Sequence, residues 1–136
     1  MKSNQDLEIT LSNIHHFKGN LKFNIKDFPS DLWDVFDKEI YRTTHLAEII
    51  PLSLLVSTKN QLEDPMFLSG KKNDPRQTAY ERMLDASRGL IRKRRPITVR
   101  RNINRKFYVV DGNATSQALM LTGWEKVPVE ILHNPR

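Results

Sequence analysis

The stretch that decides the fold spans residues 94–132 and reads RRPITVRRNINRKFYVVDGNATSQALMLTGWEKVPVEIL. Apolar and polar residues alternate at 97–100, which predicts a half-buried strand. Asparagines at 102–105 favour a hairpin turn, since asparagine tolerates a positive φ. The chain then returns as a second strand at 107–110.

The turn Asp111-Gly112-Asn113 follows this second strand, with Asn113 as a helix N-cap. A short helix closes at Gly123, and a final strand follows at 127–131. The order strand, hairpin, strand, helix, strand predicts an α+β fold with a small mixed sheet and flanking helices.

The rest of the chain adds an N-terminal extension, residues 1–45, packed on a main domain at 46–136. Alternating apolar residues predict strands at 7–11 and 21–25, and helical spacing predicts a helix at 31–42. The apolar run 48–56 is expected to be one buried strand.

Residues 57–74 show no period and predict a long loop, functional or mobile. Asp74-Pro75 is a good helix start, and Gly89 and Pro96 end that helix. Its apolar stripe is formed by Ala79, Met83, Ala86 and Leu90.

The 136-residue chain has no cysteine, which excludes disulfides, thiolate zinc sites and cysteine nucleophiles. No apolar run approaches the length of a membrane span, and no secretory signal is visible. The expected location is therefore cytoplasmic, without a membrane partner.

The charge is unevenly distributed within a net charge of +6. Residues 86–110 contain nine basic residues and no acidic one, which favours a polyanionic partner, a nucleotide or DNA. The alternative is a solvated basic surface. The expected nucleic-acid contacts are Arg92, Lys93, Arg94, Arg95, Arg105 and Lys106.

The 111–113 turn is a candidate phosphate site, because a glycine turn before a helix N-terminus stabilises anions. Asp111 is the candidate catalytic base or Mg²⁺ ligand, and Asn113 the second catalytic candidate. The expected phosphate-binding residues are Gly112, Ala114, Thr115 and Ser116, with charge from Arg88, Arg100 and Arg101. The same tripeptide is also an ordinary turn.

Element order and local sequence resemble the N-terminal domain of the partition protein ParB, in the ParB/sulfiredoxin superfamily. The matching features are Ile-Pro-Leu at 50–52, a helix ending in basic residues before Pro96, Val-Val-Asp-Gly-Asn at 109–113, and Gly-Trp at 123–124. The resemblance covers about residues 48–132. It implies a nucleotide-phosphate site at 112–118, with a nucleoside triphosphate as ligand or substrate.

Several positions depart from that family pattern. Asn113 stands where partition proteins have Glu and sulfiredoxin has its catalytic Cys, so sulfiredoxin chemistry is excluded. Ala114 and Thr115 replace an Arg pair or His-Arg, which weakens the usual phosphate grip. No helix-turn-helix follows residue 132, so a complete partition protein is not expected.

Other polar residues carry weaker hypotheses. The histidines, including the adjacent His15 and His16, lack metal-ligand spacing. The carboxylates Glu63 and Asp64 are expected to be solvated or to approach the site, and Tyr108 is the candidate for base stacking.

Two functions remain in competition. One is a ParB-like nucleotide hydrolase, phosphotransferase or nuclease, of mobile-element or toxin origin by resemblance. The other is a non-catalytic nucleic-acid-binding or adaptor protein with a degenerate nucleotide site. The sequence leaves the oligomeric state open.

Overall fold

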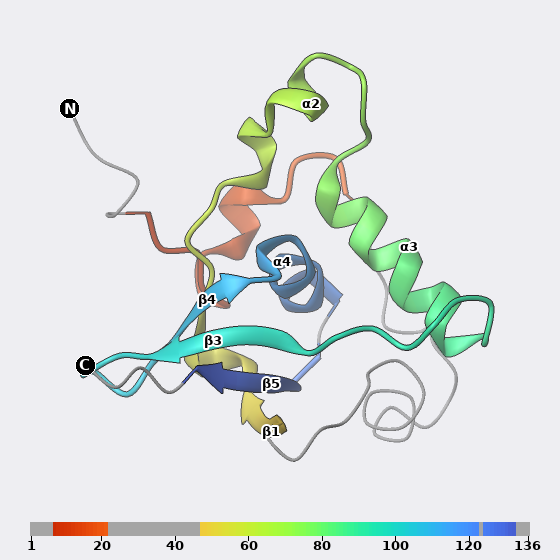
Figure 1. Cartoon of the computed structure of the whole chain (residues 1–136). Helices are drawn as coiled ribbons and strands as arrows, with labels where there is room; N and C mark the ends of the chain where they lie inside the picture. Colours follow the sequence, from red (N-terminus) through yellow and green to blue (C-terminus); the bar gives the residue numbers. More distant parts are fainter. Residues whose placement is uncertain (1–6, 22–46, 123, 133–136) are drawn as a thin grey trace.

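The computed structural model describes residues 7–21, 47–122 and 124–132, which form a mixed α+β fold (Figure 1). Five strands make one sheet in the order β1-β5-β3-β4-β2. The strands are β1 (Ala47–Pro51), β2 (Leu55–Val56), β3 (Ile97–Arg101), β4 (Phe107–Asp111) and β5 (Lys126–Leu132). The α-helices among the described residues are α2 (Pro65–Leu68), α3 (Pro75–Ser87) and α4 (Asn113–Thr122).

The sheet mixes parallel and antiparallel pairs. β3 pairs antiparallel with β4 through the predicted hairpin, and parallel with β5 after the α4 crossover. β1 lies antiparallel to β5 at one edge, and β2 lies parallel to β4 at the other. The three predicted strands at 97–100, 107–110 and 127–131 are confirmed.

The expectation of one continuous strand at 48–56 is wrong. β1 ends at Pro51, a 3₁₀ helix (Leu52–Leu54) follows, and β2 then begins at Leu55. The two strands lie at opposite edges of the sheet. Pro51 has no N–H to donate to a ladder, so an extended run is readily interrupted there.

The strand predicted at 7–11 reduces to one bridge, in which Ile9 and Ser57 exchange backbone hydrogen bonds of 2.7 and 2.8 Å. The Asn13 side chain accepts from the Thr10 N–H at 2.8 Å and turns the chain. A 3₁₀ helix (Ile14–Phe17) follows. The other strand and helix predicted before residue 46 lie outside the described residues, except Leu21.

A buried ion pair ties this N-terminal segment to α3. The fully buried Arg76 guanidinium lies 2.8 Å from the Asp74 carboxylate. Arg76 also donates to the backbone carbonyl of Phe17. Asp74 caps α3 by accepting from the Arg76 N–H at 2.9 Å, which confirms the predicted helix start.

The predicted loop at 57–74 contains two short helices, a 3₁₀ helix (Gln61–Glu63) and α2. Asn60 caps the 3₁₀ helix, with its Oδ1 accepting from the Leu62 N–H at 3.1 Å. Asp64 caps α2, with its Oδ1 accepting from the Met66 N–H at 2.8 Å. Local capping therefore orders a segment that lacks hydrophobic periodicity.

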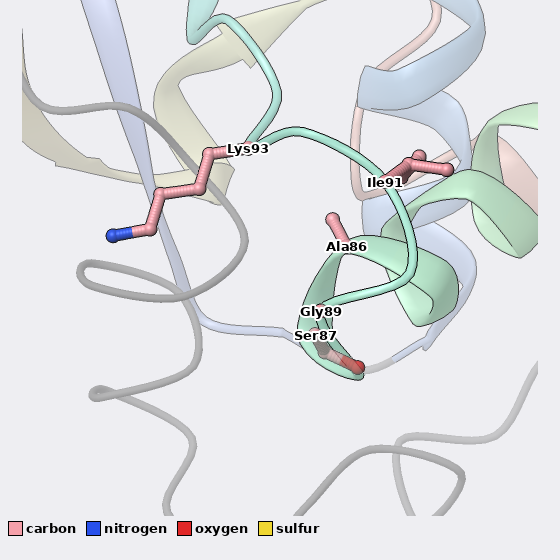
Figure 2. A pocket seen from close by; sticks show the side chains of 5 residues that line it. All are labelled: Ala86, Ser87, Gly89, Ile91 and Lys93. Carbon is pink, nitrogen blue, oxygen red and sulfur yellow. The ribbon is translucent and has the colours of Figure 1, made fainter.

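α3 ends at Ser87, three residues before the predicted stripe does. Gly89 takes a left-handed φ of 73°, and the N–H of Leu90 bonds the Asp85 carbonyl at 2.9 Å. Leu90 is consequently 69% exposed. Beyond this end lies an open hollow of about 260 Å³ (Figure 2), lined by Ala86, Ser87, Gly89, Ile91 and Lys93.

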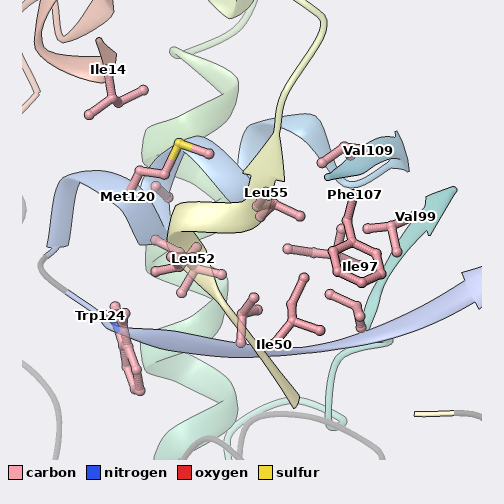
Figure 3. Packing of buried hydrophobic residues seen from close by; sticks show 14 of the residues in the cluster. Ile14, Ile50, Leu52, Leu55, Ile97, Val99, Phe107, Val109, Met120 and Trp124 are labelled. Atoms are coloured by element: carbon pink, nitrogen blue, oxygen red, sulfur yellow. The ribbon is translucent and has the colours of Figure 1, made fainter. Parts of the chain in front are cut away.

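The core lies between the sheet and the helices, with α4 packed on β3 and β4 and α3 packed on α4 (Figure 3). Ile97, Val99, Phe107 and Val109 are buried on this side of the hairpin. Trp124, before β5, is also buried. Among the described residues, no helix has the length and hydrophobicity that a bilayer crossing requires.

Candidate functional site

The junction between β4 and α4 requires glycine for two reasons. Gly112 has a φ of 104°, a backbone conformation that residues with a side chain rarely adopt. A Cβ at this position would lie 3.2 Å from Cγ1 of Ile97 on β3. Gly112 therefore combines a positive φ with a close approach to Ile97, and both favour glycine.

Asn113 begins α4 and ties it to the segment after β2. Its Oδ1 accepts from the Ser57 hydroxyl at 2.6 Å and from the Thr58 N–H at 3.0 Å. The side chain thus holds a neighbouring segment rather than capping its own helix. Because Oδ1 already accepts two hydrogen bonds, this side chain would contact a ligand by donating from Nδ2.

Gln117, one turn further along α4, completes this polar network. Its Nε2 donates to the Ser57 hydroxyl at 2.8 Å and to the Lys59 carbonyl at 2.7 Å. Both Gln117 and Ser57 are fully buried. The network fixes the backbone of Lys59 beside the start of α4.

The first turn of α4 has backbone donors to offer. The N–H of Ser116 bonds the Gly112 carbonyl at 2.8 Å. The N–H groups of Asn113, Ala114 and Thr115 have no acceptor among the described residues, as expected at a helix start. Ser116 is buried and donates its hydroxyl to the Asn113 carbonyl, so it does not line the site.

Two adjoining cavities open at this helix start, and both are lined by Lys72, Pro75 and Ala114. The smaller, about 250 Å³, is completed by Thr78, Ala79, Arg82, Arg94 and Thr115. The larger, about 420 Å³, is completed by Lys59, Gln61, Asp64, Val110, Asp111, Gly112 and Asn113. We call the two together the α4 cleft.

The smaller cavity is lined by three cations and no carboxylate: Lys72, Arg82 and Arg94. Arg94 reaches the Thr115 hydroxyl, with Nη2 to Oγ1 at 3.3 Å. Its Nε is buried and has no acceptor among the described residues. A buried, unpaired guanidinium N–H is costly, and an anion accepting from it would remove that cost.

The cations expected at this site lie elsewhere. Arg88 follows the C-terminal end of α3, about 20 Å along the helix from Pro75. Arg100 and Arg101 pair with the start of β4, whereas Asp111 at its end pairs with Thr98. None of the three lines the α4 cleft.

The predicted nucleic-acid contacts divide into three places. Arg94 lines the α4 cleft. Arg92, Lys93 and Arg95 are exposed on the connection from α3 to β3. Arg105 and Lys106 lie in the turn between β3 and β4.

Two carboxylates line the larger cavity, Asp111 and Asp64. Asp64 uses Oδ1 to cap α2, which leaves Oδ2 for another partner. In residues 7–21, 47–122 and 124–132 no three His, Asp or Glu side chains gather into a metal-holding group. Two carboxylates suffice for Mg²⁺ when phosphate oxygens and water complete its shell.

Tyr108, the stacking candidate, is engaged at its hydroxyl. It donates to the Glu8 carboxylate, and this bond raises the pKa of Tyr108 above its ordinary value of 10.0. Desolvation and the Glu8 charge add to the shift. The ring remains partly exposed on the sheet face opposite the helices.

Sequence reasoning missed Lys59, Lys72 and Arg82. Two of these lie in the 57–74 segment, which carried no pattern to assign them. Arg82 had a signal, since residues 75, 78, 79 and 82 follow the i, i+3, i+4, i+7 spacing of one helix face. That face lines the smaller cavity.

No protein-family model, curated protein or solved structure matches this chain.

Proposed function

We propose that this chain binds a phosphate-bearing ligand, a nucleotide or a nucleic-acid phosphate, in the α4 cleft and acts on it by phosphoryl hydrolysis or transfer. The observation that carries the proposal is the buried Arg94 Nε, which has no acceptor in the part of the chain that the structure describes and lines the same cavity as the start of α4. Helix N-termini and guanidinium groups are both strong phosphate donors.

The two cavities have different roles: the smaller binds phosphate, and the larger contains the reactive groups. In the smaller, Arg82, Arg94 and Lys72 neutralise phosphate charge, and the Thr115 hydroxyl adds a hydrogen bond. These cations stand in for the Arg pair that the family resemblance leads one to expect at 114 and 115. The ParB/sulfiredoxin-like assignment belongs to the same proposal.

The larger cavity supplies the reactive groups. Asp111 is exposed and orients a water molecule in the cavity; if Mg²⁺ is required, Asp111 and Asp64 would hold it. When bound, Mg²⁺ would offset the charge that develops on the transferred group. Asn113 acts as a positioning residue, because its Oδ1 is already committed to Ser57 and Thr58.

A thermal-shift panel tests binding and identifies the ligand. ATP, CTP, GTP, ADP and short DNA strands are compared, each with and without Mg²⁺. A ligand at 100 times its Kd stabilises the fold by about 2.7 kcal/mol. We expect one nucleotide to raise the Tm and Arg82→Gln to abolish that rise, while the matched Arg88→Gln retains it.

Turnover is measured separately. Asp111→Asn should keep the ligand-induced shift and lose hydrolysis, and unchanged hydrolysis in this variant would remove the role given to Asp111. Binding without any turnover in the wild type would favour the second candidate, a non-catalytic nucleic-acid-binding or adaptor protein. The exposed cations Arg92, Lys93 and Arg95 support that candidate.

A further inference from the structure

The turn between β3 and β4 is closed by hydrogen bonds and does not line the α4 cleft (Figure 1). The Asn102 N–H bonds the Lys106 carbonyl at 2.8 Å, and the Arg105 N–H bonds the Asn102 carbonyl at 3.0 Å. Asn104 Oδ1 accepts from the Lys106 N–H at 3.2 Å. Arg105 takes a left-handed φ of 67°, as in three-residue hairpin loops.

This turn places one aliphatic side chain entirely in solvent. Ile103 is 100% exposed, more than any other large hydrophobic residue that the structure describes. The hydrogen bonds that close the turn are made by backbone groups and by the Asn102 and Asn104 side chains, so the fold does not require isoleucine here. Single exposed aliphatic residues are common, and the surroundings decide what this one means.

Those surroundings are cationic. Arg100, Arg101 and Arg105 are exposed, and Lys106 is half-exposed. Arg101 is held over the Phe107 ring, 5.0 Å from its centroid. The neighbouring carboxylate is that of Glu8, which accepts from Tyr108. An apolar tip between cations and asparagine amides suits a ligand with both charge and stacked apolar surface.

We propose that the β3–β4 hairpin binds duplex DNA from the minor groove, with Ile103 inserted between two base pairs. Minor-groove proteins use such aliphatic wedges to unstack a base step, while Arg, Lys and Asn contact the groove and phosphates. The four cations at 100, 101, 105 and 106 contact the phosphates on either side. One aliphatic residue is too small an anchor for a lipid surface, so DNA fits this tip better.

The surface is separate from the α4 cleft, because the hairpin turn lies at the opposite end of β4 from Asp111. A duplex bound at the hairpin therefore does not depend on the phosphate ligand proposed above. Loss of either function would leave the other measurable.

The test uses the full chain and an A·T-rich duplex that carries 2-aminopurine, whose fluorescence rises when it unstacks. We expect wild-type protein to raise the signal. Ile103→Ser should abolish the rise and weaken binding about tenfold or more, the loss expected for one buried aliphatic contact. Ile103→Leu should restore both.

The matched control is Leu68→Ser, which removes an aliphatic side chain 68% exposed on α2 and should change nothing. Arg105→Gln should lower the slope of log Kd against log salt by about one, whereas Ile103→Ser should leave the slope unchanged. The proposal is overturned if Ile103→Ser binds and unstacks the duplex like wild type. Equal affinity for the single strands, or Ile103-dependent binding to anionic vesicles without duplex binding, would overturn it as well.

Discussion

The Ser57 hydroxyl donates to Oδ1 of Asn113 at 2.6 Å, across 56 positions of the chain. Ser57 also exchanges backbone hydrogen bonds with Ile9 and receives the Gln117 amide. Three separate segments therefore meet at one buried residue, Ser57. The start of α4, and with it the proposed phosphate site, is positioned by this meeting point.

Asn113→Ala should destabilise the fold by about 1–3 kcal/mol, because it leaves the buried Ser57 hydroxyl and the Thr58 N–H without their acceptor. Urea denaturation measures the change. Asn113→Asp keeps an acceptor and should be nearly as stable as wild type, but its charge should weaken phosphate binding. An alanine variant as stable as wild type would show that the network contributes nothing.

Gly112→Ala should lower the free energy of unfolding by more than Gly70→Ala does. Both glycines have positive φ, 104° and 77°, but an added Cβ meets Ile97 only at Gly112 and meets nothing within 4 Å at Gly70. The backbone strain alone is worth about 1–3 kcal/mol. In an Ile97→Ala background, which lacks both Cγ atoms that the added Cβ meets, Gly112→Ala should cost less stability than it does in the wild type. Equal losses at the two glycines would argue against the close approach.

Arg76→Met should destabilise the protein by about 3–5 kcal/mol, the usual result of breaking a buried ion pair by removing one partner. The Asp74 carboxylate remains, and the anchor to Phe17 is lost. Chemical denaturation gives the free energy, and limited proteolysis should show early cleavage before residue 21. The matched Arg82→Met changes an exposed side chain of the same helix and should be close to neutral for stability.

The Glu8–Tyr108 hydrogen bond predicts a loss of stability in alkali. The pKa of Tyr108 is raised in the folded state, chiefly by this bond. Folding therefore favours the protonated phenol, so the contribution is complete below pH 10 and declines as pH rises through the raised pKa. Subtracting the Tm of Tyr108→Phe from that of wild type should give a difference that shrinks above pH 10. A difference independent of pH would contradict the assignment.

The hairpin, α3 and β5 could be predicted from the sequence, because alternating hydrophobicity, a capping aspartate and glycine turns are signals that act over a few residues. The division of residues 48–56 between opposite edges of the sheet could not be predicted in this way. The same apolar run is compatible with one continuous strand or with two short ones. Only the positions of β4 and β5 decide between these two arrangements.

The site was predictable in part for the same reason. Gly112 and the free start of α4 are local features, and the structure has both. The cations of the cleft come from Lys59, Lys72, Arg82 and Arg94, which are brought together by packing rather than by spacing. The dense basic run in the sequence predicts Arg100 and Arg101 instead, which lie at the far end of β4.

Phosphate binding at the start of α4 is tested most directly by an NMR titration of the full chain with the nucleotide that the thermal panel selects. We expect the largest chemical-shift changes, saturating with ligand, at the N–H groups of Ala114 and Thr115 and at the Nε–H of Arg94. Arg82→Gln should weaken binding in this titration, whereas Arg100→Gln should not. Saturating shifts confined to the β3–β4 hairpin, with the α4 resonances unmoved, would contradict it.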